Sequence, residues 1–168
     1  MGKNDAALKF QTWSLVMILL VSSATIAGAW AFQIIIDLVP CPLCFQGRWH
    51  HYAAIPLTIV TLLLLRPNPQ VARMLMILLG LVFLAGAIFS VYHAGIEYGF
   101  WPGPESCATG AGSPTSAGSL LTQMQSTKVV ACDEAAWTLM GISLAGYNAL
   151  ISFALAAMAF KASTAAKI

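Results

Sequence analysis

Four long stretches of the chain are almost free of charged residues, and this feature restricts the possible folds more than any other. They cover about residues 13–36, 49–65, 71–92 and 137–160. A helix that crosses the hydrocarbon core of a membrane needs about 20 mostly apolar residues, because each residue adds about 1.5 Å to a required length of about 30 Å. Each stretch therefore predicts one membrane-crossing helix.

The second stretch is shorter than the others, so its helix is expected to begin upstream and to cover about residues 45–65. Pro56 lies inside this helix and is able to kink it, because proline leaves a backbone carbonyl without a donor. Only 8% of the residues are charged and 59% are hydrophobic, against about 25% charged in soluble domains. The prediction is an all-α integral membrane protein, a four-transmembrane-helix bundle forming a single membrane domain over residues 1–168.

The basic residues predict the orientation of this bundle. Six of the eight lie at one end of the predicted helices: Lys3, Lys9, Arg66, Arg73, Lys161 and Lys167. Basic residues concentrate on the cytoplasmic side of membrane proteins, so both termini are expected in the cytoplasm. A cleaved signal peptide is disfavoured, because the first apolar run is longer than a signal core of about 7–15 residues. The net charge of +2 gives no reason to expect nucleic acid as a partner.

Two segments are then expected on the outer side, at about residues 37–44 and 94–136. The longer one contains the Gly-, Pro- and Ser-rich sequence FWPGPESCATGAGSPTSAGS. Such a composition buries little apolar area, so this loop is predicted to be partly mobile. Within it, the apolar spacing of residues 117–126 is compatible with a short helix on the membrane surface and equally with ordinary loop packing.

All four cysteines fall on the outer side: Cys41, Cys44, Cys107 and Cys132. Four cysteines allow three pairings, and the spacing makes Cys41–Cys44 with Cys107–Cys132 the default. Thiols that face an oxidising compartment form disulfides. Disulfide chemistry is therefore expected here.

The pair Cys41 and Cys44 forms a Cys-x-x-Cys motif, which can hold a metal, attach haem or exchange electrons. Haem attachment needs a histidine directly after the second cysteine, and Phe45 stands there. Zinc needs four ligands, and beyond the pair only His50 or His51 lies nearby in sequence, so no metal is predicted. These two histidines are expected to be interfacial side chains. Redox exchange remains.

Arg48 follows Cys44 by four residues. If the second helix has begun at this point, the Arg48 guanidinium lies one turn beyond Cys44 on the same helix face. Its charge then favours a thiolate or another anion there. The alternative is that Arg48 only extends towards the interface, and spacing leaves both interpretations open.

Cys107 and Cys132 flank the Gly- and Ser-rich part of the long loop. A purely structural disulfide would close a loop of about 25 residues, worth about 3 kcal/mol by chain entropy. A relay between an outside thiol protein and Cys41–Cys44 would instead need mobility, since exchange requires in-line attack. The predicted mobility of the sequence between Cys107 and Cys132 favours the relay over a purely structural disulfide.

The sequence resembles the bacterial disulfide-bond formation protein B (DsbB) family, membrane enzymes that reoxidise the periplasmic dithiol oxidase DsbA with quinone. Three segments carry the resemblance, in order and at matching separations: PCPLCFQGRWHHYA, YHAGIEYGFWPGPESC and VVACDEAAWTLMGISLAGYNALISF. The resemblance implies a thiol:quinone oxidoreductase in the bacterial inner membrane with its cysteines on the periplasmic side. Its implied partners are a DsbA-like thiol oxidase, the membrane quinone pool (ubiquinone or menaquinone) and the lipid bilayer.

The resemblance also assigns roles to individual residues. Cys41 and Cys44 match the pair that passes electrons to the quinone, with Cys44 in contact with its ring. Arg48 and His93 match residues that bind the quinone head group. The two remaining cysteines match the mobile-loop pair, in which Cys107 forms the mixed disulfide with the partner and Cys132 is the leaving thiolate. Gly47 departs from family members that carry glutamate at this place, which puts an acid–base role there in doubt.

Two other interpretations lead to different functions. A non-catalytic tetraspan membrane adaptor would use its disulfides only to hold its outer loops together. Enzymes similar to vitamin K epoxide reductase place Cys-x-x-Cys late in the chain, whereas here the motif follows the first apolar stretch. The order of motifs therefore favours the DsbB-like interpretation.

Overall fold

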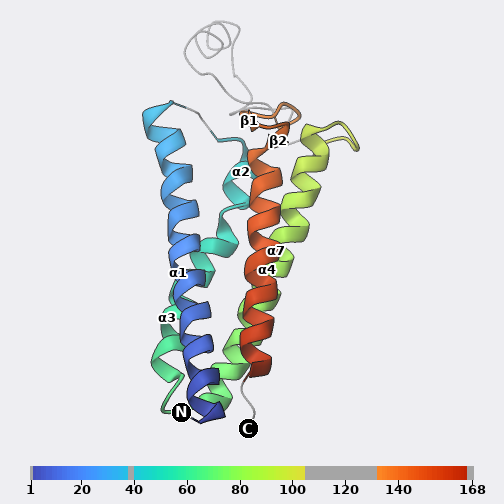
Figure 1. Cartoon of the computed structure of the whole chain (residues 1–168). Coiled ribbons are helices and arrows are strands. Elements are labelled where there is room, and N and C mark those ends of the chain that lie inside the picture. Colours follow the sequence, from blue (N-terminus) through green and yellow to red (C-terminus); the bar gives the residue numbers. More distant parts are fainter. Residues whose placement is uncertain (1, 38–39, 105–131, 166–168) are drawn as a thin grey trace, which may run out of the picture.

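The computed structural model describes residues 2–37, 40–104 and 132–165. Residues 117–126, whose sequence allows both a surface helix and loop packing, and Cys107 lie outside these residues. The described helices and strands are α1 (Lys3–Ile35), α2 (Pro42–Gln46), α3 (Trp49–Leu64), α4 (Pro69–Glu97), β1 (Thr138–Leu139), β2 (Ile142–Ser143) and α7 (Leu144–Ala165) (Figure 1). The described part of the chain is thus mainly helical, as predicted.

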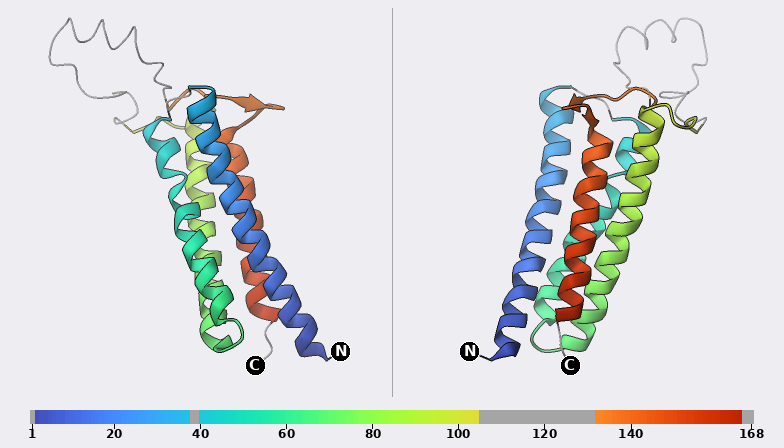
Figure 2. Two further views of the ribbon diagram at one scale, coloured as in Figure 1. Left: turned by 90° about the vertical axis from the view of Figure 1, so that its left-hand side faces the viewer. Right: turned by 45° about the vertical axis from the view of Figure 1, so that its right-hand side comes forward.

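The four long helices run alongside one another, and each packs mainly against two neighbours. α1 lies against α3 and α7, while α4 lies against α3 and, most extensively, against α7 (Figure 2). The core between them contains fully or almost fully buried side chains such as Leu15, Met76, Phe83 and Leu155. Two glycines of α4 allow close approach, because a Cβ on Gly80 would collide with the ring of Phe160 and one on Gly86 with the ring of His50.

Large apolar side chains also cover the outside of the helices. Each long helix exposes at least one of them by more than half: Leu20 on α1, Leu63 on α3, Ile88 on α4 and Leu150 on α7. Such a surface suits lipid rather than water. Among the described residues, α1, α4 and α7 are each long and apolar enough to cross a membrane, whereas α3 has only 16 residues.

The second apolar stretch differs from the single helix predicted over 45–65. It forms α2 and α3, separated by a tight turn at Gly47 and Arg48. The Gly47 carbonyl accepts a hydrogen bond of 3.0 Å from Asn148 Nδ2 on α7 instead of continuing a helix. Glycine is a poor helix former, so the interruption falls here. Pro56 lies within the continuous α3.

The fourth apolar stretch also begins differently from the predicted 137–160. Residues 138–143 form the β1–β2 hairpin, and α7 starts only at Leu144. Met140 and Gly141 have φ angles of 51° and 80°, as in the two-residue turns that join antiparallel strands. Tyr98 ties this hairpin to the end of α4, since its hydroxyl donates to Gly141 O at 2.9 Å and accepts from Ser143 N at 2.9 Å.

The first predicted outer segment, 37–44, is shortened because α2 already begins at Pro42. The second, 94–136, is shifted along the chain, because α4 continues to Glu97 and α7 begins only at Leu144. α1 begins, and α7 ends, at the end of the bundle opposite α2 and the hairpin (Figure 1). The described cysteines therefore lie at the other end of the helices from the two termini.

Candidate functional site

A disulfide joins Cys41 and Cys44 at the start of α2, with a Cα–Cα distance of 5.0 Å. Cys41 is the N-cap residue of this helix, and its sulfur accepts a hydrogen bond from Cys44 N at 3.0 Å. Pro42 follows at the start of the helix. Proline lacks a backbone N–H, and at this position the N–H group has no partner within the helix in any case. The local sequence thus forms one helical turn that brings the two sulfurs together, as the Cys-x-x-Cys spacing predicted.

The two cysteines face different surroundings. Cys41 is 1% exposed and packs in a small cluster with Leu43, Ile96 and Cys132. Cys44 is partly buried and lines a cavity of about 240 Å³. The disulfide therefore lies between the outer cysteine Cys132 on one side and the cavity on the other.

The cavity lies below the α2 turn, between α1, α4 and α7. Most of its lining is apolar, and the small residues Ala24, Gly28 and Ala29 form its α1 side. A Cβ placed on Gly28 would meet no atom within 4 Å, so this glycine borders open space. The polar side chains of the lining are Thr25, Gln33, Cys44, Arg48, His51, His93, Glu97, Tyr147 and Asn148. The cavity is thus an apolar pocket with a limited polar end, as small-molecule sites usually are.

Arg48 lines this cavity from the turn between α2 and α3. Its Nη1 donates to Gln33 Oε1 on α1 at 3.2 Å. Arginine is not deprotonated in proteins, so Arg48 brings a positive charge to the cavity that Cys44 also lines.

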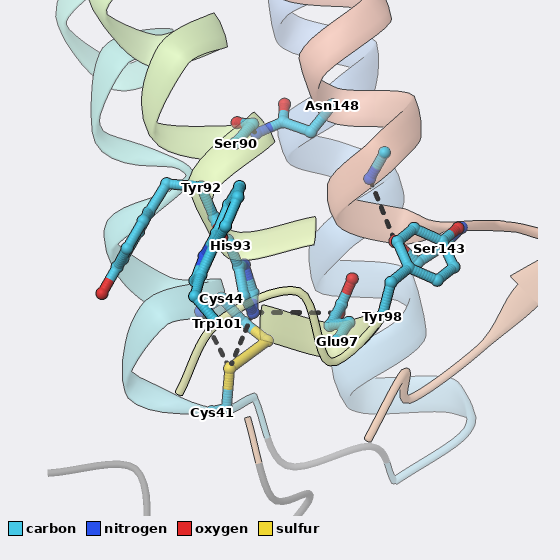
Figure 3. Close-up of polar contacts among 11 residues, drawn as sticks. Cys41, Cys44, Ser90, Tyr92, His93, Glu97, Tyr98, Trp101, Ser143 and Asn148 are labelled. Carbon is cyan, nitrogen blue, oxygen red and sulfur yellow. Dashed lines mark hydrogen bonds and ion pairs between the residues drawn. A yellow bond between two sulfur atoms is a disulfide. The ribbon is translucent and has the colours of Figure 1, made fainter. Parts of the chain in front are cut away.

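His93, on α4, lies against the disulfide. Its Nε2 is 3.6 Å from Cys41 Sγ and 3.8 Å from Glu97 Oε1 (Figure 3). The ligand atoms of Cys41, Cys44 and His93 all lie within 4.8 Å of one another. The sulfurs are joined to each other, however, and zinc binds thiolates. In this disulfide-bonded state the two sulfurs are therefore not available as thiolate ligands of a metal.

His50 and His51 lie inside the helix bundle and not at the interface, so the sequence prediction for them is wrong. His50 Nε2 contacts Ser152 Oγ at 2.8 Å, and His51 donates from Nε2 to Asn148 Oδ1 at 3.0 Å. Polar side chains inside an apolar bundle find partners on neighbouring helices because no water is available to them. The partners come from α7, about 100 positions later in the chain.

Asn148 is a site residue that sequence reasoning missed. Besides accepting from His51, its Nδ2 donates to Gly47 O at 3.0 Å and to Ser90 Oγ at 2.8 Å. One amide therefore connects α7 to α3, to α4 and to the turn before Arg48. A lone asparagine in an otherwise apolar stretch was the available signal. Glu97 was also missed, although its position four residues after His93 places both on one helix face.

Replacing Asn148 with alanine is expected to lower the free energy of unfolding by about 2 kcal/mol, because buried partners on three elements lose their hydrogen bond. Thermal unfolding in detergent measures the effect. Leu150→Ala is the matched control, since Leu150 is 56% exposed on the same helix and has no such network. Equal losses in both variants would contradict this role of Asn148.

Cys132 is 1% exposed and disulfide-bonded. The structure places Cys132 in one cluster with Cys41. In the sequence, only the family resemblance had related these two cysteines to each other. Cys107 lies outside the described residues, so its pairing stays a prediction.

Apolar helices surround a Cys-x-x-Cys disulfide, and a mostly apolar cavity with polar side chains lies beside it. This arrangement is compatible with a membrane oxidoreductase of thiol–disulfide chemistry. The sequence model of the family "Disulfide bond formation protein DsbB" matches residues 11–162, nearly the whole chain. The chain belongs to this family, whose members act in disulfide formation.

The chain is also similar to an uncharacterized protein of Rickettsia prowazekii (strain Madrid E). The two are 25% identical over 149 residues, which cover 88% of this chain and 84% of that protein. No solved structure matches the chain.

Proposed function

We propose that this protein reoxidises a periplasmic DsbA-like dithiol oxidase and passes the electrons to a membrane quinone. The observation that carries the proposal is the position of the Cys41–Cys44 disulfide. Cys41 packs with Cys132 on the outer side, and Cys44 lines a cavity that contains Arg48. An electron relay between an outer thiol protein and a membrane carrier needs such a two-sided arrangement.

The outer half of the relay uses thiol–disulfide exchange. A thiolate of the reduced partner attacks Cys107, and Cys132 leaves as a thiolate. Cys132 then attacks Cys41, which lies in the same buried cluster, and Cys44 leaves as a thiolate. The second partner thiol releases the oxidised partner, and Cys107 displaces Cys41 to restore the outer disulfide.

These steps convert one partner dithiol into a disulfide and leave Cys41 and Cys44 as a dithiol. The departing Cys44 sulfur lies in the cavity with Arg48. A thiolate in low-dielectric surroundings is costly without a nearby cation. Arg48 therefore favours cleavage of the inner disulfide at the Cys44 sulfur.

The cavity fits a quinone head group. Its walls are mostly apolar, while Arg48 offers hydrogen-bond donors and His93 a ring nitrogen that can hold or accept a proton. Arg48, His93 and Gln33 would hold the polar groups of the head group, and Cys44 would exchange electrons with it. Restoring the Cys41–Cys44 disulfide releases two electrons and two protons, and a bound quinone would supply the acceptor for both.

An acceptor of this kind also explains the direction of the reaction. DsbA is a strong oxidant with a reduction potential of about −120 mV, so ordinary thiol couples cannot reoxidise it. A quinone pool in the membrane supplies a stronger oxidant. The surrounding protein contributes position and charge.

The proposed setting is the bacterial inner membrane, crossed four times. α2 and α3 together cover Pro42–Leu64 and provide the second crossing beside α1, α4 and α7. Exposed Leu63 and Val60 on α3 support contact with lipid. Arg66, Arg73 and Lys161 belong to the end of the bundle where the termini lie, which supports a cytoplasmic position for that end.

Gly28 provides a sharp test of the proposed quinone site. A Cβ on Gly28 meets no atom within 4 Å, so Gly28→Leu is expected to retain the fold. Its side chain takes up space in the cavity, so the KM for a soluble quinone is expected to rise about tenfold or more, equivalent to about 1.4 kcal/mol of lost binding. Quinone consumption by purified protein with a reduced DsbA-like partner measures this. Ala27→Leu is the matched control, since Ala27 is exposed and outside the cavity lining.

The same assay decides between enzyme and adaptor. A wild-type protein that consumes no quinone with the reduced partner would refute the proposed function and favour a tetraspan adaptor. Equal KM values for Gly28→Leu and Ala27→Leu, with an active wild type, would refute the location of the site only.

A further inference from the structure

Glu97, the last residue of α4, is a buried acid beside the redox site. Its side chain is 5% exposed, and its Oε1 lies 3.8 Å from His93 Nε2. Among the residues that the structure describes, Oε2 has no hydrogen-bond partner. An enclosed acidic side chain in a membrane protein is costly and usually serves a function.

Glu97 and Cys41 contact the same nitrogen of His93. The Nε2 atom is 3.6 Å from Cys41 Sγ and 3.8 Å from Glu97 Oε1 (Figure 3). His93 and Glu97 both line the cavity that holds Cys44 and Arg48, whereas Cys41 is absent from that lining. The three groups therefore form a continuous line from the buried sulfur to the cavity.

The contacts from Cys41 through His93 to Glu97 matter because oxidation of the Cys41–Cys44 dithiol must remove two protons as well as two electrons. The Cys44 proton can leave directly, since Cys44 faces the cavity. Cys41 is 1% exposed and enclosed by Leu43, Ile96 and Cys132, none of which can accept a proton readily. Among the described contacts of its sulfur, the basic atom is His93 Nε2.

We propose that Glu97 receives, through His93, the proton that Cys41 releases and delivers it to the cavity. The S–H bond of Cys41 breaks as an N–H bond forms on His93, and that proton then passes to the Glu97 carboxylate. The sulfurs of Cys41 and Cys44 join in a disulfide, and their two electrons go to the quinone. Both protons reach the same acceptor, one from Cys44 and one from Glu97, so the step balances.

The inference rests on the proposed function and adds a residue to it. Glu97 acts through His93 and does not touch the sulfurs, so it is a positioning and proton-relay residue. A purely structural role is the competing explanation, because the Glu97 side chain also contacts Ser143 at the end of the hairpin. The two roles predict different behaviour of conservative variants.

Glu97→Gln keeps the size and the hydrogen-bonding capacity of the side chain but cannot accept a proton. We expect it to slow the quinone-dependent reoxidation of the reduced Cys41–Cys44 pair by about a hundredfold, a typical contribution of one acid–base group. Exchange between the oxidised protein and the reduced partner, followed without quinone, is expected to keep its wild-type rate. Glu97→Asp retains a carboxylate and is expected to recover a large part of the lost rate.

Stopped-flow measurement of the two half-reactions tests this, with thermal unfolding of each variant recorded in parallel. Glu134→Gln is the matched control, since Glu134 is an exposed acid after Cys132. Wild-type reoxidation rates in Glu97→Gln would overturn the inference. A slow Glu97→Gln that is not rescued by aspartate, and is destabilised, would assign Glu97 to structure instead. A wild type that does not reduce quinone would refute the proposed function itself.

Discussion

Replacing Cys44 with serine is expected to reduce quinone consumption to the background rate and to leave Cys41 linked to Cys132. Without Cys44, the Cys41 thiol lies in one buried cluster with Cys132, so exchange with the outer disulfide joins these two sulfurs. No sulfur then faces the cavity to complete the reaction. Peptide mapping by mass spectrometry, without reduction, identifies the link.

Cys41→Ser is the matched variant for this experiment. It is also expected to be inactive, but the remaining Cys44 faces the cavity and lies only at the edge of the cluster. A Cys44–Cys132 link is therefore expected to form far less than the Cys41–Cys132 link does. Equal amounts of the two links would contradict the assignment of Cys41 as the sulfur that exchanges with the outer pair.

Replacing Arg48 with methionine is expected to lower kcat/KM for quinone reduction about a hundredfold, the usual effect of removing a group that stabilises developing charge in a site that excludes water. Methionine keeps much of the aliphatic packing but removes the charge that lies beside Cys44. The Arg48 bond to Gln33 is a single contact at 3.2 Å, so unfolding temperatures are expected to change little. Quinone kinetics and thermal unfolding, measured on the same preparation, separate the two effects.

Arg66→Met provides the control for charge removal, because Arg66 is exposed and follows α3 at the opposite end of the bundle. Arg48→Lys refines the test: it keeps the positive charge but not the planar fork of donors, and is expected to lie between wild type and Arg48→Met. Unchanged quinone kinetics in Arg48→Met would remove Arg48 from the site.

The helices of this protein could be predicted because hydropathy is a local property of the chain. The apolar runs predicted α1 and α4 well, although both extend further than expected. The predictions failed at two helix starts. At Gly47 a hydrogen bond from Asn148 ends α2, and at Met140 and Gly141 a turn with positive φ delays α7. Both causes involve contacts or backbone conformations that apolar patterning does not report.

The sequence by itself determined that the helices are apolar and long and that Cys41 and Cys44 pair with each other, because apolar length and a spacing of three residues act locally. Only the tertiary structure decided that Cys41 contacts His93 and shares a cluster with Cys132, that Cys44 faces the cavity, and that Glu97 lies one contact beyond His93. His93 follows Cys41 by 52 positions. Contacts over such separations depend on how the helices pack around one another, and this packing gives the two sulfurs their different surroundings.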